Sequence, residues 1–107
     1  MSWYVNGNNL TFAEDDYGVE LPLTFKGITF TARDKVEFVV KKEMNGEAIL
    51  TKTFTDISNN QIVLILTNEN TALLPVGSYI YRLDWYQDGA FMCNLVPSAS
   101  MKVVDKA

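Results

Sequence analysis

Acidic side chains are the first candidates for chemistry, because carboxylates can hold metal ions or act in pairs as acid and base. Glu14, Asp15 and Asp16 form the one acidic run in the sequence. Calcium loops place their acids at alternate positions, whereas this run is continuous and precedes Tyr17 and Gly18 as a solvated turn does. We therefore predict a turn here and no metal site.

The other candidates for catalysis are single carboxylates and one thiol. Glu37, Asp84 and Asp88 could supply an acid pair for glycoside cleavage, but outer strand positions and turn tips are ordinary places for acids. Cys93 is the single cysteine and the chain has no histidine, which excludes an internal disulfide, a Ser-His-Asp triad and a Cys-His pair. We expect Cys93 to be a buried structural thiol. The sequence predicts no catalytic residue, no cofactor and no enzyme.

Composition narrows the choice of partners. The chain has 107 residues, of which 9 are Lys or Arg and 13 are Asp or Glu, so its net charge is -4. Nucleic-acid readers usually carry the opposite sign, so we expect no nucleic-acid partner. The longest aliphatic run, residues 62–66, is too short to cross a bilayer, and the first residues lack the pattern of a secretory signal. We expect one domain over residues 1–107.

A hydrophobic period of two dominates the sequence, which predicts strands rather than helices. The expected strands are residues 19–25, 36–41, 48–54, 61–66, 78–86, 90–96 and 100–104. Residues 67–74 should form one short helical turn that buries its two leucines, and Asn45-Gly46 a type I′ turn. Seven or eight short strands with regularly spaced turns are typical of an all-β, antiparallel β-sandwich.

Two of these strands have unusual faces. Residues 61–66 are apolar on both sides, so this strand should lie in the middle of a sheet, or its second face should meet another surface. Pro22 interrupts residues 19–25 and cannot donate a hydrogen bond to a neighbour, so that strand should be an edge strand or contain a bulge.

The last hairpin has two possible registers. Its loop is either Asp88-Gly89 alone or Gln87 to Gly89. The three-residue loop turns Phe91 and Cys93 toward the core, which buries more apolar surface. It also places Gly89 at a left-handed position of a type I turn with a bulge. We therefore predict the three-residue loop.

A short aromatic block resembles the tyrosine corner of immunoglobulin-like domains. Gly77 and Tyr79 match its Gly-x-Tyr pattern, in which the tyrosine hydroxyl bonds to backbone upstream. We expect Tyr79 to be buried with its hydroxyl on the backbone of residues 70–73. Tyr81 would then occupy the place of the second disulfide cysteine, and Phe38 that of the core tryptophan.

Several aromatic and aliphatic side chains lie where the predicted strands do not bury them. Trp and Tyr concentrate at the centres of protein interfaces, so these side chains form a candidate contact surface. The candidate partner contacts are Trp3, Tyr4, Tyr17, Val39, Ile80 and Tyr86.

The middle and C-terminal parts of the sequence resemble a family of immunoglobulin-like domains in tailed-phage structural proteins, typified by the N-terminal domain of upper baseplate proteins. Residues 16–23 and 36–41 resemble its first alternating strands. Residues 66–81 are the strongest match, with a threonine-rich helical turn, a leucine and then G-x-Y-x-Y. Asp88-Gly89 resembles its usual hairpin turn, and residues 101–104 its closing strand.

This resemblance implies an immunoglobulin-like sandwich without catalytic residues. It implies a structural or assembly module of a phage or prophage particle, in the tail or baseplate, located in the virion or in the host cytoplasm before assembly. The partners would be other virion proteins or further copies of the chain, and neither nucleic acid nor membrane. The alternative is a carbohydrate- or cell-surface-binding accessory domain of a bacterial protein.

Overall fold

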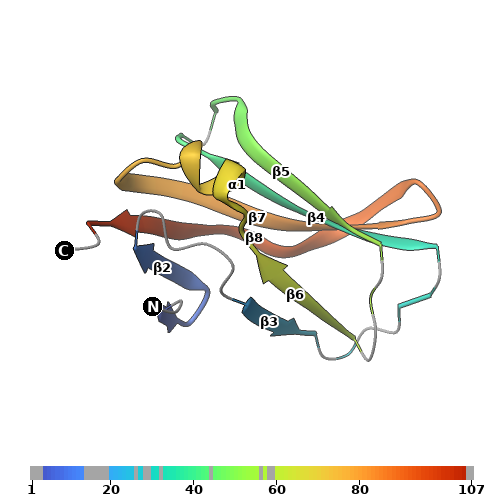
Figure 1. Cartoon of the computed structure of the whole chain (residues 1–107). Helices are drawn as coiled ribbons and strands as arrows, with labels where there is room; N and C mark the ends of the chain where they lie inside the picture. Colours follow the sequence, from blue (N-terminus) through green and yellow to red (C-terminus); the bar gives the residue numbers. More distant parts are fainter. Residues whose placement is uncertain are drawn as a thin grey trace.

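The chain forms an all-β sandwich, as the hydrophobic period predicts (Figure 1). The computed structural model describes residues 4–13, 20–25, 27, 30–31, 33–43, 45–55, 57 and 60–105. Within these residues the elements are β1 (Tyr4–Asn6), β2 (Asn9–Ala13), β3 (Glu20–Thr24), β4 (Asp34–Lys41), β5 (Ala48–Phe54), β6 (Gln61–Ile65), α1 (Asn68–Ala72), β7 (Gly77–Gln87) and β8 (Ala90–Val104).

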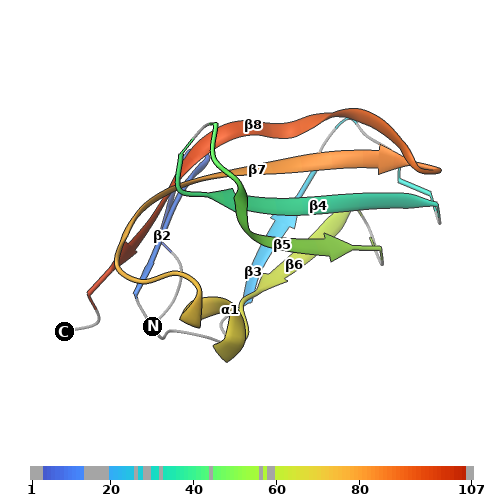
Figure 2. The ribbon, with the colours of Figure 1, turned by 90° about the horizontal axis from the view of Figure 1, so that it is seen from above.

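The strands form two sheets that face each other. The larger sheet has the order β1-β2-β8-β7-β4-β5 and the smaller one pairs β3 with β6. Figure 2 shows β8, β7, β4 and β5 side by side, with β3 and β6 against one face of this layer. One pairing departs from the antiparallel pattern, since β2 and β8 run parallel.

Alternating side chains from both sheets fill the space between them. On β4, Val36, Phe38 and Val40 are buried, as their period of two predicts. Tyr81 on β7 packs against Phe38, with ring centroids 5.6 Å apart. The core cluster comprises Leu10, Phe12, Val36, Phe38, Val40, Leu50, Ile62, Leu64, Leu66, Leu74, Tyr79, Tyr81, Leu83, Met101 and Val103.

β6 pairs with one strand in the described part of the chain, so the first alternative, a central strand, is wrong. Within the described residues it pairs with β3 alone, and only one of its faces is buried. Ile62 and Leu64 enter the core, whereas Val63 between them is 38% exposed. An apolar run fixes neither the number of partners of a strand nor what covers its second face. Pro22 on β3 lies opposite Val63 and points outward from an edge strand, as predicted.

The short helix α1 begins where the sequence predicts a cap. Thr67 is the N-cap, and its hydroxyl accepts the backbone N–H of Asn70. The Asn70 side chain in turn accepts the N–H of Thr67, which completes a capping box. Leu74 closes onto the core as predicted, but Leu73 is half exposed, so only one of the two leucines is buried.

The two predicted turns differ from their expected geometry. Gly46 does not have the positive φ that a type I′ turn at Asn45-Gly46 requires, and its N–H instead bonds to the carbonyl of Glu43 at 3.0 Å. Asp88 and Gly89 do have positive φ, 51° and 84°, and form a two-residue loop. The predicted three-residue loop is therefore wrong, although the left-handed Gly89 is confirmed.

Irregularities in β8 change which of its side chains face the core. The register between β7 and β8 shifts at three places. Tyr86 lies opposite Phe91, as the two-residue loop requires, and the first shift after it places Cys93 opposite Trp85. Each shift exchanges the two faces of a strand locally. Cys93 is exposed, which corrects the prediction of a buried thiol. Phe91 is exposed as well.

Candidate functional site

The outer face of the larger sheet carries a hollow of about 490 Å³ over β4, β7 and β8. We call it the outer hollow. Its volume is within the range of pockets that bind small ligands. The lining residues are Val39, Lys41, Ile80, Tyr81, Arg82, Asp84, Tyr86, Phe91, Asn94, Pro97 and Ser98.

A buried carboxylate is the centre of the polar side of this hollow. Asp84 is 3% exposed, although it lies on the face of β7 that points away from the core. Arg82 Nε donates to Asp84 Oδ2 at 2.7 Å, and Asn94 Nδ2 donates to Asp84 Oδ1 at 2.5 Å. Both carboxylate oxygens are thus satisfied, as a buried charge requires.

Strand geometry explains why these three groups meet. Arg82 and Asp84 are two residues apart on β7, so their side chains leave the same face. Asn94 is the partner of Asp84 in the β7–β8 ladder, on the far side of one register shift. The arrangement therefore depends on the irregular pairing of β8.

Two aromatic rings form the apolar end of the outer hollow. Tyr86 and Phe91 are ladder partners, and their rings meet edge to face with centroids 5.6 Å apart. The ammonium of Lys35 lies 4.7 Å from the centroid of the Tyr86 ring. Phe91 is 54% exposed, so part of its ring is available to a partner.

The outer hollow contains half of the side chains predicted as partner contacts. Val39, Ile80 and Tyr86 all line it. Val39 is on the predicted outer face but is 4% exposed, so its neighbours cover it and it presents little free surface. Trp3, Tyr17 and the side chain of Tyr4 lie outside the described residues.

Sequence reasoning did not find the polar half of the hollow. Arg82, Asp84 and Asn94 are ordinary outer residues in the strand pattern, and only a charged pair at i and i+2 on one face could have suggested a cluster. The three-residue loop places Phe91 in the core, so the predicted register does not identify it as a surface residue.

The tyrosine corner is present, with one change of partner. Tyr79 is buried and its Oη donates to the carbonyl of Pro75 at 2.6 Å, rather than to residues 70–73. A Cβ on Gly77 would lie 2.9 Å from Lys42 Nζ, the ammonium that covers the Tyr79 ring. Burial raises the pKa of Tyr81 to about 12, and its hydroxyl donates to the carbonyl of Asn8. These contacts join loops to β7 and are structural.

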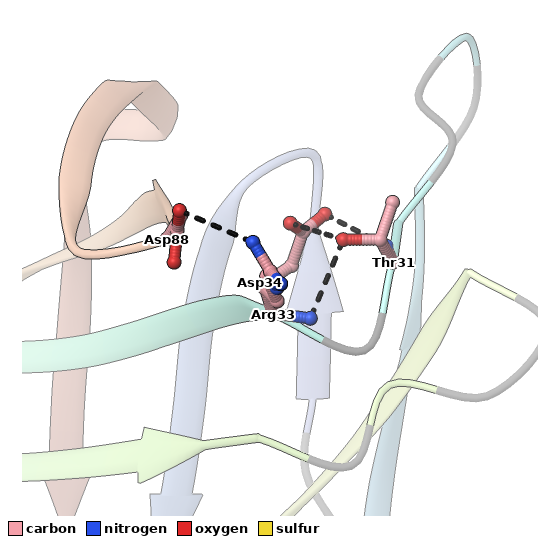
Figure 3. Close-up of polar contacts among 4 residues, drawn as sticks. All are labelled: Thr31, Arg33, Asp34 and Asp88. Carbon is pink, nitrogen blue, oxygen red and sulfur yellow. Dashed lines mark hydrogen bonds and ion pairs between the residues drawn. The ribbon is translucent and has the colours of Figure 1, made fainter.

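A second buried carboxylate, Asp34, has a structural role at the start of β4 (Figure 3). Thr31 donates its N–H to Asp34 Oδ2 and its hydroxyl to Oδ1, both at 3.0 Å. Burial alone would raise the pKa of Asp34, but the hydrogen bonds from Thr31 and Gln87 outweigh it, and the pKa is lowered. Nearby, Arg33 Nη1 lies 3.5 Å from Asp88 Oδ2.

The carboxylates considered for catalysis are held apart in different contacts. Asp84 is paired with Arg82, Glu37 lies 3.5 Å from Lys35 Nζ, and Asp88 binds Arg33 across the end of the sheet. In the described part of the chain, no three acidic, cysteine or histidine side chains gather as metal ligands. The acidic run 14–16 lies outside that part.

Comparisons of the chain with protein-family models, with curated proteins and with solved structures gave no match. Among the described residues, no helix has the length and apolar character needed to cross a membrane.

Proposed function

We propose that this chain is a non-enzymatic binding module that contacts another protein through the outer hollow. The observation that carries this proposal is the meeting of Arg82, Tyr86 and Phe91 in one concave surface. Arginine and aromatic side chains are the residue types enriched where protein interfaces gain most of their affinity. Such a surface supports docking of a partner's side chains.

The setting that we propose is a phage or prophage particle, with the chain as a structural or assembly part of the tail or baseplate. Support comes from the resemblance of residues 66–81 to immunoglobulin-like domains of tailed-phage structural proteins. In the fold, this block contains the capped helix and the tyrosine corner that close one end of the sandwich. The partner is another virion protein or a further copy of the chain.

A carbohydrate- or cell-surface-binding accessory domain is the second candidate. Tyr86 and Phe91 lie in the same hollow as Asp84 and Asn94, and sugar sites also combine aromatic rings with amide and carboxylate groups. Against this candidate, the ammonium of Lys35 covers one face of the Tyr86 ring. A sugar ring could therefore stack only on its other face or on Phe91.

Photocrosslinking in particle-producing cells tests the proposal. The photoreactive residue p-benzoylphenylalanine replaces Phe91 in the outer hollow, and in a matched control it replaces Val63 on the opposite sheet. We expect position 91 to capture a particle protein or a second copy of the chain, and position 63 to capture neither. Capture at neither position, together with a rise in melting temperature caused by neutral glycans, would instead support the second candidate.

A further inference from the structure

The geometry points to a carboxylate as the group that the outer hollow recognises: an Asp or Glu side chain, with an apolar neighbour, on an acidic segment of the partner protein. This inference rests on the proposed function and specifies the chemistry of the partner. Three observations carry it: the N–H groups of Arg82 that have no described partner, the contact by which Asp84 holds the Arg82 Nε group, and the local balance of charge.

Most N–H groups of the Arg82 guanidinium have no partner among the described residues. A guanidinium has five N–H groups in a planar fork. In the described part of the chain, the Arg82 side chain donates from Nε to Asp84 and makes no other hydrogen bond or ion pair. Its side chain is 36% exposed, and neither terminal amino group has a partner among the described residues. Two parallel N–H groups match the two oxygens of a carboxylate.

Asp84 acts as a positioning residue for this fork. Its carboxylate is buried, and Asn94 holds the oxygen that Arg82 does not use. A guanidinium anchored through Nε loses less conformational freedom when it binds a ligand than a free side chain does. The hollow is thus organised before a partner arrives.

The charge of the hollow favours an anion of one unit. Arg82 and Asp84 balance each other, and outside the hollow Lys35 balances Glu37. Lys41 also lines the hollow and makes no ion pair with any described residue, which leaves one positive charge in excess. The chain as a whole carries -4, so this site is a local exception. A carboxylate carries one negative charge, whereas a phosphate would add up to two beside the buried Asp84.

The apolar lining indicates the neighbour of that carboxylate. Ile80 and Val39 lie with Lys41 in the hollow, and Phe91 is exposed at the other end. A peptide in which an apolar residue follows the acid would place its carboxylate on Arg82 and its apolar side chain on Phe91. The covered face of Tyr86 favours a peptide over an acidic sugar.

Titration of the ¹⁵N-labelled protein with small probes, followed by NMR, tests this inference. The probes are N-acetyl-Glu-Phe-amide, its neutral match N-acetyl-Gln-Phe-amide, glucuronate and inorganic phosphate. We expect the Glu dipeptide to cause saturable shifts at the amides of Val39, Arg82 and Asn94. The Gln dipeptide should bind at least about fivefold more weakly than the Glu dipeptide. Equal binding of the two dipeptides, no shift at all, or tighter binding of glucuronate or phosphate would overturn it.

The two arginines of the chain provide a matched pair of variants. Arg82→Met should abolish the preference for Glu over Gln, whereas Arg33→Met should leave it unchanged, because Arg33 lies outside the hollow on Asp88 (Figure 3). Arg82→Met also leaves Asp84 without its cation, so Arg82→Lys serves as the second variant. It keeps a charge beside Asp84 but lacks the planar fork, and it should weaken the Glu dipeptide about fivefold. Lys41→Met removes the other positive charge of the hollow and serves as a third variant. If Arg82→Lys and Lys41→Met each keep the parent's preference for the Glu over the Gln dipeptide, the assignment is contradicted.

The two proposals fail in different ways. Capture of a particle protein at position 91 without any shift by the Glu dipeptide would reject the carboxylate and leave the docking face standing. Carboxylate binding without capture of a protein would reject the proposed function instead.

Discussion

Lys52 Nζ lies 2.9 Å from Asn70 Oδ1, and this contact joins the edge strand β5 of the larger sheet to the helix α1 that follows β6. The same ammonium donates to the carbonyl of Ile65. Asn70 Oδ1 also accepts the N–H of Thr67, so one side-chain oxygen serves the helix cap and the link between the sheets. Burial lowers the pKa of Lys52, but the ammonium keeps two oxygen partners.

Replacement of Lys52 should therefore destabilise the domain. Lys52→Met removes the donor and leaves the Ile65 carbonyl and one position on Asn70 Oδ1 unsatisfied, at a cost on the order of 1–3 kcal/mol. Urea unfolding monitored by tryptophan fluorescence measures the change. The exposed Lys102→Met is the control and should differ from the parent protein by less than about 0.5 kcal/mol. Equal midpoints for the two variants would show that the link contributes nothing.

The lowered pKa of Asp34 predicts how the free energy of unfolding depends on pH. Its pKa is lowered in the folded state, and the unfolded value is about 3.9. Below that value the unfolded chain takes up the proton more readily, so the stabilisation present at neutral pH is lost as the pH falls through the folded pKa. Asp34→Asn should thus be less stable than the parent at pH 7, and the difference should shrink below about pH 3. Urea midpoints at both pH values give the answer, and a constant difference would refute the role of the charge.

The contribution of the tyrosine corner to stability can be measured by removing the hydroxyl of Tyr79. Tyr79→Phe removes the bond to Pro75 and leaves its carbonyl without this donor, which should cost on the order of 1–2 kcal/mol. Tyr86→Phe removes a hydroxyl from the outer hollow and serves as the control, with an expected change below about 0.5 kcal/mol. Thermal and urea unfolding of both variants make the comparison. A loss as large in the control would show that the Pro75 bond has no special weight.

The thiol distinguishes the two registers of the last hairpin. Cys93 is exposed with the two-residue loop, whereas the three-residue loop would bury it. We expect one equivalent of a water-soluble disulfide reagent to react with the folded protein without denaturant, in minutes. A thiol that reacts only after addition of urea would favour the three-residue loop.

The parts of the fold that follow from local patterns could be predicted from the sequence. The period of two on β4 identifies Val36, Phe38 and Val40 as core residues. The pattern holds there because β4 lies inside the larger sheet, between β7 and β5. The cap at Thr67 and the hydroxyl bond of Tyr79 also depend on residues within four positions.

The outer hollow could not be predicted, because it depends on register shifts in β8. A regular ladder from Asp88-Gly89 would place neither Cys93 opposite Trp85 nor Asn94 opposite Asp84. The one register shift between Tyr86 and Trp85 brings Asn94 to the carboxylate, and no residue pattern in β8 indicates where it occurs. Val39 is also buried although it lies on the outer face of β4, which the period of two does not predict.

The position of β8 between β2 and β7 has a kinetic consequence. Leu10 pairs with Met101, so a strand near the start of the chain can join the larger sheet only through the last strand. Closing so long a loop costs entropy before any contact compensates for it, and domains with many such pairings fold in milliseconds to seconds. During synthesis on the ribosome, β2 can pair with β1, but it cannot pair with β8 until β8 has emerged. β4 and β5 emerge before β7 and β8, so these four strands can assemble before β2 joins the larger sheet.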